Sequence, residues 1–65
     1  MITKVVLDAE GHWRIKNMSD HGRYFPALFM YKRRAVNVKR GLDDNKAWAL
    51  RAANFRKWMD TDDGL

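Results

Sequence analysis

The sequence predicts an α+β fold, in which a three- or four-stranded antiparallel sheet carries one C-terminal helix packed on one face. Up to residue 40, short β-branched or alternating segments are separated by polar and charged turns, which is typical of strands. From residue 43 onward, large apolar side chains recur at helical spacing. Because a chain of 65 residues is near the lower size limit for a stable core, we expect a single domain over residues 1–59 and an acidic, disordered tail at residues 60–65.

The first predicted element is a β-hairpin. Residues 2–7 are β-branched and apolar, and residues 8–11 form a polar turn that ends in Gly11, a residue free to adopt positive φ. Residues 12–16 then alternate between apolar and polar side chains. We therefore expect two antiparallel strands joined by this turn.

The alternation gives the second strand one apolar and one basic face. Trp13 and Ile15 fall on the apolar face, whereas Arg14 and Lys16 fall on the basic face, which should meet solvent or a ligand. A chain this short has few other large groups to bury, so most of its aromatic side chains should lie in the core. The aromatic residues that we assign to the core are Trp13, Phe29, Trp48 and Phe55.

The middle of the chain predicts a second hairpin. Residues 24–31 are apolar on both faces, which is typical of a strand covered on both sides, although Pro26 limits the first part to an edge, a bulge or a strand start. Residues 32–34 are Lys-Arg-Arg and are expected to form the hairpin tip. Residues 35–40 alternate again, so we expect a strand with its two valines inward and with Asn37 outward.

The last predicted element is a helix that begins after Asp43. The Asp43 carboxylate can cap the first N–H groups of a helix, and Gly41 fits a tight turn between strand and helix. One face of this helix should pack on the sheet. Its residues are Trp48, Ala52, Phe55 and Met59, at spacings of i, i+4, i+7 and i+11.

A second, weaker apolar stripe lies on a neighbouring side of the predicted helix. It makes the apolar face wider than a helix on a small sheet normally buries. The stripe could contact the N-terminal strand of the same chain or pair two copies as a homodimer through Leu50 and Trp58; we favour the contact within one chain. Its members are Ala47, Leu50, Asn54 and Trp58.

The charge of the chain points to an acidic partner. Thirteen Lys and Arg residues outweigh eight Asp and Glu residues, for a net charge of +5. Three of the acidic residues lie in the last six positions, so residues 1–59 carry a net charge of +8. Such an excess on a small body suits a polyanion, although it can also serve solubility alone.

Most of the cations fall into one region of the predicted sheet, where they could meet successive phosphates. Asn37 lies between two valines and could reach an adenine edge if the strand entered the major groove. Charged hairpins also protect sheet edges from aggregation, which is the simpler interpretation. The predicted nucleic-acid-binding residues are Arg14, Lys16, Lys32, Arg33, Arg34, Asn37, Lys39 and Arg40.

The order of these segments resembles the AP2-like DNA-binding domain of phage and mobile-element proteins and plant transcription factors, and the related arm-binding domain of tyrosine-type integrases. The resemblance extends over residues 11–59, with strands at 13–18, 25–31 and 35–40 and an alanine-rich helix after them. It implies a three-stranded sheet that faces duplex DNA and a helix that braces the back of the sheet. The chain differs from that family in the added segment at residues 2–7 and in the apolar second strand.

These patterns predict a small protein that binds double-stranded DNA and acts in regulation, in recombination or as an architectural protein. Two other hypotheses remain open. A phage-type protein could use its apolar strand to bind and modulate a host protein such as RNA polymerase. Alternatively, a binder of RNA or single-stranded DNA would stack bases on exposed rings, for which the candidates are Tyr24, Phe29 and Tyr31.

Catalytic and metal-binding patterns are weak. His12 and His21 are the two histidines, and Ser19 and Asp20 beside the second one are too close in sequence to act as a catalytic set. The sequence has no cysteine, and its acidic tail lacks the alternating carboxylates of a calcium loop. We therefore expect no enzyme, cofactor or metal, and a cytoplasmic protein without a membrane segment.

Overall fold

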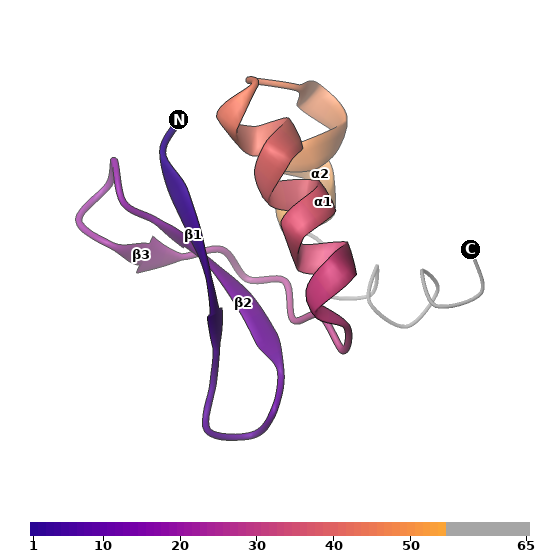
Figure 1. Cartoon of the computed structure of the whole chain (residues 1–65). Coiled ribbons are helices and arrows are strands. Elements are labelled where there is room, and N and C mark those ends of the chain that lie inside the picture. Colours follow the sequence, from indigo (N-terminus) through magenta and orange to yellow (C-terminus); the bar gives the residue numbers. More distant parts are fainter. Residues whose placement is uncertain (55–65) are drawn as a thin grey trace.

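The computed structural model describes residues 1–54 of the chain, and its fold belongs to the α+β class (Figure 1). A three-stranded antiparallel sheet with the strand order β1-β2-β3 is followed by two helices. The predicted class and an antiparallel sheet of three strands are thus confirmed, whereas the prediction of a single helix is wrong. The elements are β1 (Thr3–Leu7), β2 (Trp13–Asn17), β3 (Arg23–Tyr24), α1 (Lys32–Asp43) and α2 (Ala47–Asn54).

The N-terminal hairpin forms as predicted. Strands β1 and β2 pair antiparallel, with Val5 opposite Ile15. The turn between them is closed by Asp8, whose Oδ1 accepts hydrogen bonds from the backbone N–H groups of Glu10 and His12, both at 2.9 Å. Gly11 adopts a φ of 86°, which an L-residue with a side chain rarely takes. The turn chemistry and the alternation of the strands therefore fix the same register.

The predicted strand at residues 24–31 is present only in part. Strand β3 covers two residues, and its Tyr24 lies opposite Lys16. Pairing with β2 resumes at an isolated bridge between Trp13 and Phe29, so three residue steps along β2 are matched by five on the other segment. The excess residues bulge around Pro26, which has no N–H to donate to a ladder.

The structure overturns the predicted hairpin tip at residues 32–34 and the predicted strand at residues 35–40. Both segments belong to α1. The alternating valines suggested a strand over a short window, but Ala35, Val38 and Leu42 recur at i, i+3 and i+7 and are all buried. Burial of this helical stripe outweighs the weak preference of valine for strands.

Two further predictions about the helix boundary are wrong. Gly41 lies inside α1 rather than in a turn, and it is buried where the two helices touch. A Cβ atom on Gly41 would stand 2.5 Å from the Cβ of Ala49 and 2.7 Å from the ring of Trp48, so glycine permits this close approach. Asp43 ends α1 instead of capping the next helix. The turn between the helices contains Asn45, with a φ of 59°.

Helix α2 buries small side chains rather than the predicted stripe of large ones. Trp48 covers Gly41 with one edge of its ring but remains 42% exposed, so its assignment to the core is wrong. Leu50 is also exposed. The other large members of both predicted stripes, Phe55, Trp58 and Met59, lie outside the described residues, as does the predicted tail at residues 60–65. The buried residues of α2 are Ala49, Ala52 and Ala53.

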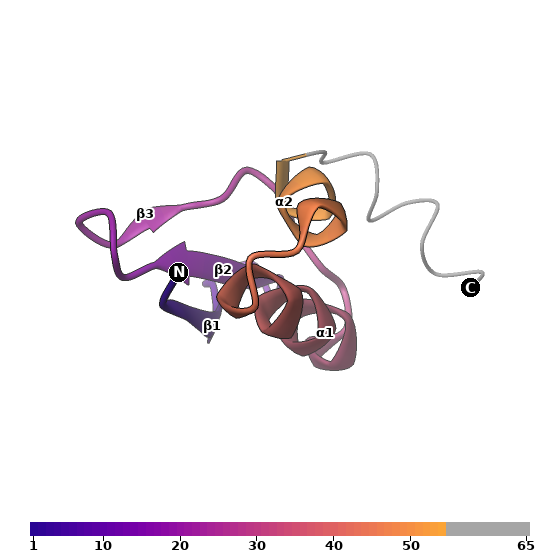
Figure 2. The same ribbon diagram turned by 90° about the horizontal axis from the view of Figure 1, so that it is seen from above.

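Both helices lie on the same side of the sheet, and the core lies between them and the strands (Figure 2). Ile15 and Phe29 are its largest fully buried side chains on the sheet side, and Leu42 is the largest on the helix side. Val5 and Trp13 pack against this cluster and are partly buried. The opposite side of the sheet therefore has no helix over it within the described part of the chain.

Candidate nucleic-acid interface

The eight residues predicted to contact nucleic acid do not form one surface. Their positions divide them between two sides of the molecule, because α1 covers one side of the sheet. We call the first surface the outer ridge of α1, which consists of Arg33, Asn37 and Arg40. We call the second the open sheet face, which consists of Lys4, Val6, Arg14, Lys16 and Tyr24.

The outer ridge of α1 follows from helical spacing. Its three residues stand at i, i+4 and i+7, on the side of α1 opposite the buried Ala35 and Val38, and all three are exposed or partly exposed. The two arginines are separated by about 10.5 Å along the helix axis. Within residues 1–54, neither arginine forms an ion pair. The ridge therefore presents two uncompensated cations with an amide between them.

The first turn of α1 adds to this charge. It contains Lys32, Arg33 and Arg34, no acidic residue, and no side-chain cap from Tyr31. Cations at the positive end of a helix dipole are electrostatically unfavourable. The Nζ atom of Lys32 lies 5.5 Å from the centre of the Trp13 ring, which offsets part of that cost through a cation–π contact.

Two of the predicted residues are engaged elsewhere. Arg34 is half-buried. Lys39 forms an ion pair with Asp43, with 2.6 Å between Nζ and Oδ2, and Asp43 also accepts a hydrogen bond from the buried Thr3 hydroxyl at 2.9 Å. Burial raises the pKa of Asp43, but the hydrogen bonds from Lys39 and Thr3 lower it by more, so the pKa lies below the ordinary value of 3.8. This network ties α1 to β1 rather than facing a ligand.

The open sheet face follows from the alternation of the strands. Lys4 lies directly opposite Lys16 on β1 and β2, and Tyr24 lies opposite Lys16 on β3. These positions have the opposite parity to Ile15 and Val5, which pack in the core. The face carries three cations and no carboxylate. Like charges directly opposite one another destabilise a sheet.

Tyr24 organises the cations on this face. The guanidinium carbon of Arg14 lies 4.7 Å from the centre of the Tyr24 ring, and the Nζ atom of Lys16 lies 5.6 Å from it. Arg14 also donates a hydrogen bond from its Nη2 to the carbonyl oxygen of Phe25 at 3.4 Å. Its Nε is buried and has no hydrogen-bond partner among the described residues. Arg14 thus holds Tyr24 in place more than it reaches outward.

The sequence-based prediction did not include Lys4, although the signal was present. Lys4 has the same parity as Val6, and the hairpin register that brings Val5 to Ile15 places Lys4 beside Lys16. Of the three rings proposed to stack bases, Tyr24 and Tyr31 are exposed, whereas Phe29 is buried and cannot serve that role.

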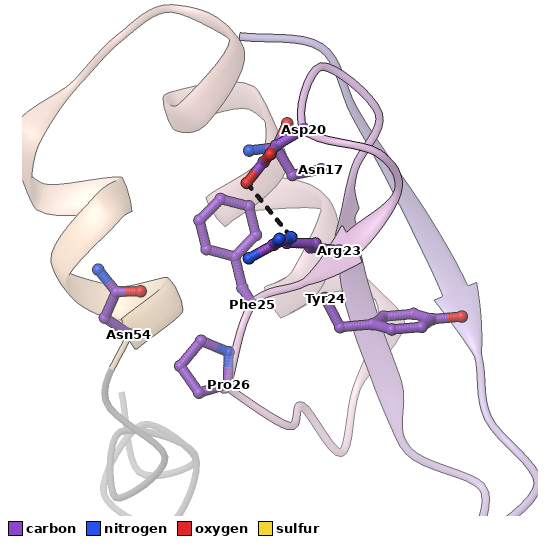
Figure 3. Close-up of a pocket in the computed structure, with 7 residues that line it drawn as sticks. All are labelled: Asn17, Asp20, Arg23, Tyr24, Phe25, Pro26 and Asn54. Atoms are coloured by element: carbon purple, nitrogen blue, oxygen red, sulfur yellow. Dashed lines mark ion pairs between the residues drawn. The ribbon is translucent and has the colours of Figure 1, made fainter.

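A shallow pocket of about 180 Å³ opens beside β3. Figure 3 shows the Tyr24 ring directed away from the other lining residues, so the ring belongs to the open sheet face rather than to this pocket. The Asp20 and Arg23 side chains form a 4.0 Å ion pair there, and both are largely exposed. The lining residues are Asn17, Asp20, Arg23, Tyr24, Phe25, Pro26 and Asn54.

In the described part of the chain, no three His, Asp or Glu side chains gather in a way that could hold a metal ion. No helix within residues 1–54 is both long and apolar enough to cross a bilayer. No protein-family model, curated protein or solved structure matches this chain, so nothing in these comparisons bears on the resemblance to AP2-like domains.

Proposed function

We propose that this chain binds double-stranded DNA through the outer ridge of α1. The observation that carries the proposal is the row of Arg33, Asn37 and Arg40 on the outer side of one helix, whose arginines form no ion pair to any residue in the described range. The major groove admits an α-helix, and phosphates line both of its edges. A helix with cations at both ends of such a row and an amide between them suits that geometry.

The chemistry of the row assigns different tasks to its members. The two arginines would neutralise phosphates, or one of them would contact a guanine, while Asn37 would pair with an adenine edge. Because α1 is braced by the sheet through the Thr3–Asp43–Lys39 network, docking would not require the helix to fold on binding. The protein would act by occupying DNA, as a regulator, a recombination accessory or an architectural protein.

Fluorescence anisotropy with a labelled duplex at several salt concentrations tests this proposal. The variant Arg33→Gln/Arg40→Gln should bind more weakly, and the slope of log affinity against log salt should fall by about two, since each phosphate that an arginine neutralises contributes about one unit. The matched control is Lys46→Gln/Arg51→Gln, which removes the same charge from exposed positions outside the ridge. Equal reductions in both variants would show that net charge, and not the ridge, determines binding.

The amide is tested separately. Asn37→Ala should leave the salt slope unchanged, because it removes no charge, but it should reduce discrimination within a panel of duplex sequences. Unchanged discrimination would restrict the proposed function to phosphate contacts.

One observation favours a protein partner instead. Met30 and Tyr31, just before α1, are 51% and 55% exposed, so two large apolar side chains lie next in sequence to the cations of the first turn of α1. A host protein such as RNA polymerase could dock there. In that case Met30→Ser should abolish partner binding while leaving duplex affinity unchanged.

A further inference from the structure

We infer that the open sheet face is a second nucleic-acid surface, and that its ligand is a single strand with one base stacked on Tyr24. This surface is separate from the outer ridge of α1, and the inference does not depend on duplex binding. Three observations support it: the open sheet face is positively charged, Arg14 holds the Tyr24 ring in position, and Gly22 leaves space for the Lys16 side chain.

The positive charge of the open sheet face favours a polyanionic ligand. Lys4 and Lys16 stand directly opposite each other, and Arg14 is the next cation along β2. Within the described residues, none of the three forms an ion pair. A chain of phosphates passing over β1 and β2 would relieve this repulsion, and phosphate neutralisation with release of counterions would supply affinity.

The exposed Tyr24 ring favours single-stranded over double-stranded nucleic acid as the ligand. Tyr24 is 47% exposed, yet Arg14 fixes its position through the 4.7 Å contact with the ring and the hydrogen bond to Phe25. An exposed ring already held in position loses little side-chain entropy when a base stacks on it. Bases inside a duplex are stacked on each other, whereas those of a single strand are free to lie on an aromatic side chain.

The Gly22 backbone leaves space for the Lys16 side chain. Gly22 adopts a φ of 71°, and a Cβ atom there would stand 2.9 Å from the Cε of Lys16. The aliphatic part of Lys16 therefore lies against the glycine backbone, and its ammonium group lies near the Tyr24 ring. The turn between β2 and β3 thus contacts one of the two paired lysines beside the Tyr24 ring.

Titrations with labelled oligo(dT) and oligo(rU) test the inference, and the two probes distinguish DNA from RNA as the source of the strand. Lys4→Gln/Lys16→Gln should weaken binding of the bound probe and lower its salt slope by about 1.4, since each phosphate contact on a single strand contributes about 0.7. Tyr24→Leu should weaken binding roughly 5- to 150-fold, whereas Tyr24→Phe should bind as the parent does. Thermal melts should show that each variant is folded.

An oligonucleotide without bases provides the decisive control. Tyr24→Leu and the parent should bind it equally, because the phosphates remain and nothing can stack. The ridge variant Arg33→Gln/Arg40→Gln should keep its affinity for the single strand. If instead the ridge variant loses the single strand while Lys4→Gln/Lys16→Gln keeps it, or if no oligonucleotide binds, the inference is overturned. Duplex binding measured in parallel shows independently whether the proposed function stands.

Discussion

The outer ridge of α1 and the open sheet face carry cations of the same kind but hold them differently. On the ridge, Arg33 and Arg40 extend from a helix and make no ion pair to residues 1–54. On the sheet, Arg14 and Lys16 are gathered around one tyrosine ring. The first arrangement leaves the side chains free to follow phosphates, and the second fixes them before a ligand arrives.

This difference separates two routes to binding. Mobile arginines lose conformational entropy on binding but adapt to many phosphate positions. Cations and a ring that are already fixed lose less entropy but accept fewer geometries. The two surfaces share one small core. Substitutions in that core, at the contact between the helices, in the polar network that joins α1 to β1 and at one cross-strand lysine pair therefore test whether the two surfaces depend on each other.

The largest effect is expected from Phe29→Ala. Phe29 is 2% exposed and bridges to Trp13 on β2, so the variant leaves a cavity beneath both surfaces. Truncation of a buried phenylalanine costs about 3–5 kcal/mol, which is most of the stability of a small domain. Denaturant unfolding should show the loss, and binding to duplex and to single strand should fall together.

The neighbouring residue supplies the control for this prediction. Met30→Ala removes a side chain that is half-exposed, so the free energy of unfolding should change by less than about 0.5 kcal/mol. A Phe29→Ala variant that unfolds at the same denaturant concentration as the parent would mean that the two surfaces do not depend on a common core.

The next largest effect is expected from Gly41→Ala. Alanine is favoured over glycine within a helix by about 1 kcal/mol, but its Cβ would stand 2.5 Å from that of Ala49. Because the Cβ of Ala49 is fixed to the backbone of α2, the two helices would have to separate, and we expect a net destabilisation of about 1–2 kcal/mol from overpacking. The melting temperature measures this loss.

The same contact allows a rescue. Adding Ala49→Gly to Gly41→Ala removes the opposing methyl group, so the double variant should lose less stability than the two single effects combined. Strict additivity would contradict the close approach of the helices. In either outcome the residues of the open sheet face are unchanged, so single-strand binding should persist while α1 shifts.

The N-terminal hairpin was predictable because several independent signals agree there. Alternation over residues 12–16, β-branched residues in the first strand and a glycine in the turn all specify one register. Residues 35–40 carry conflicting signals, since Val36 and Val38 alternate like a strand while Ala35, Val38 and Leu42 repeat like a helix. Only packing against the sheet and α2 decides between them.

The candidate site was predicted by residue type but not by arrangement. Cations at positions 14, 16, 33 and 40 were identified from the sequence, and Lys4 was overlooked. Their division into two surfaces depends on the helix at residues 32–43, which we did not predict because the strand and helix signals conflict there. Trp48 shows a related limit: its size favoured the core, but Gly41 and Ala49 bring the helices so close that the ring remains at the rim.

The polar tie between α1 and β1 predicts a dependence of stability on pH. Because the pKa of Asp43 is lowered in the folded chain, the unfolded chain binds its proton more readily, and the contribution of Asp43 is present above about pH 3.8 and lost as the pH falls through the folded pKa. Asp43→Asn should cost about 1 kcal/mol at neutral pH, which is less than the roughly 1.5–3 kcal/mol of a buried charged hydrogen bond because the side chain is 31% exposed.

Urea unfolding at neutral pH and well below pH 3.8 checks the sign of this effect. The difference between the parent and Asp43→Asn should shrink in acid, where the parent carboxylate is protonated. Asp44→Asn is the matched control, since the Asp44 side chain is exposed and the hydrogen bonds of Thr3 and Lys39 go to Asp43 instead. If the difference in unfolding free energy between the parent and Asp43→Asn grows in acid, the Thr3–Asp43–Lys39 network does not stabilise the fold as described.

The smallest effect is a gain in stability that comes with weaker binding. Lys4→Gln relieves the like-charge pair with Lys16 on the open sheet face, so the free energy of unfolding should rise by about 0.2–1 kcal/mol at low salt. The gain should fade at high salt, where the repulsion is screened.

Arg40→Gln should show no such gain, because Arg40 lies in the last turn of α1, where a cation is favoured by the helix dipole. Thermal melts at two salt concentrations measure both variants, and oligo(dT) affinity measured beside them should fall for Lys4→Gln alone. If Lys4→Gln destabilises the chain, the two lysines do not repel each other appreciably, and the open sheet face then has no stored repulsion that a polyanion would relieve.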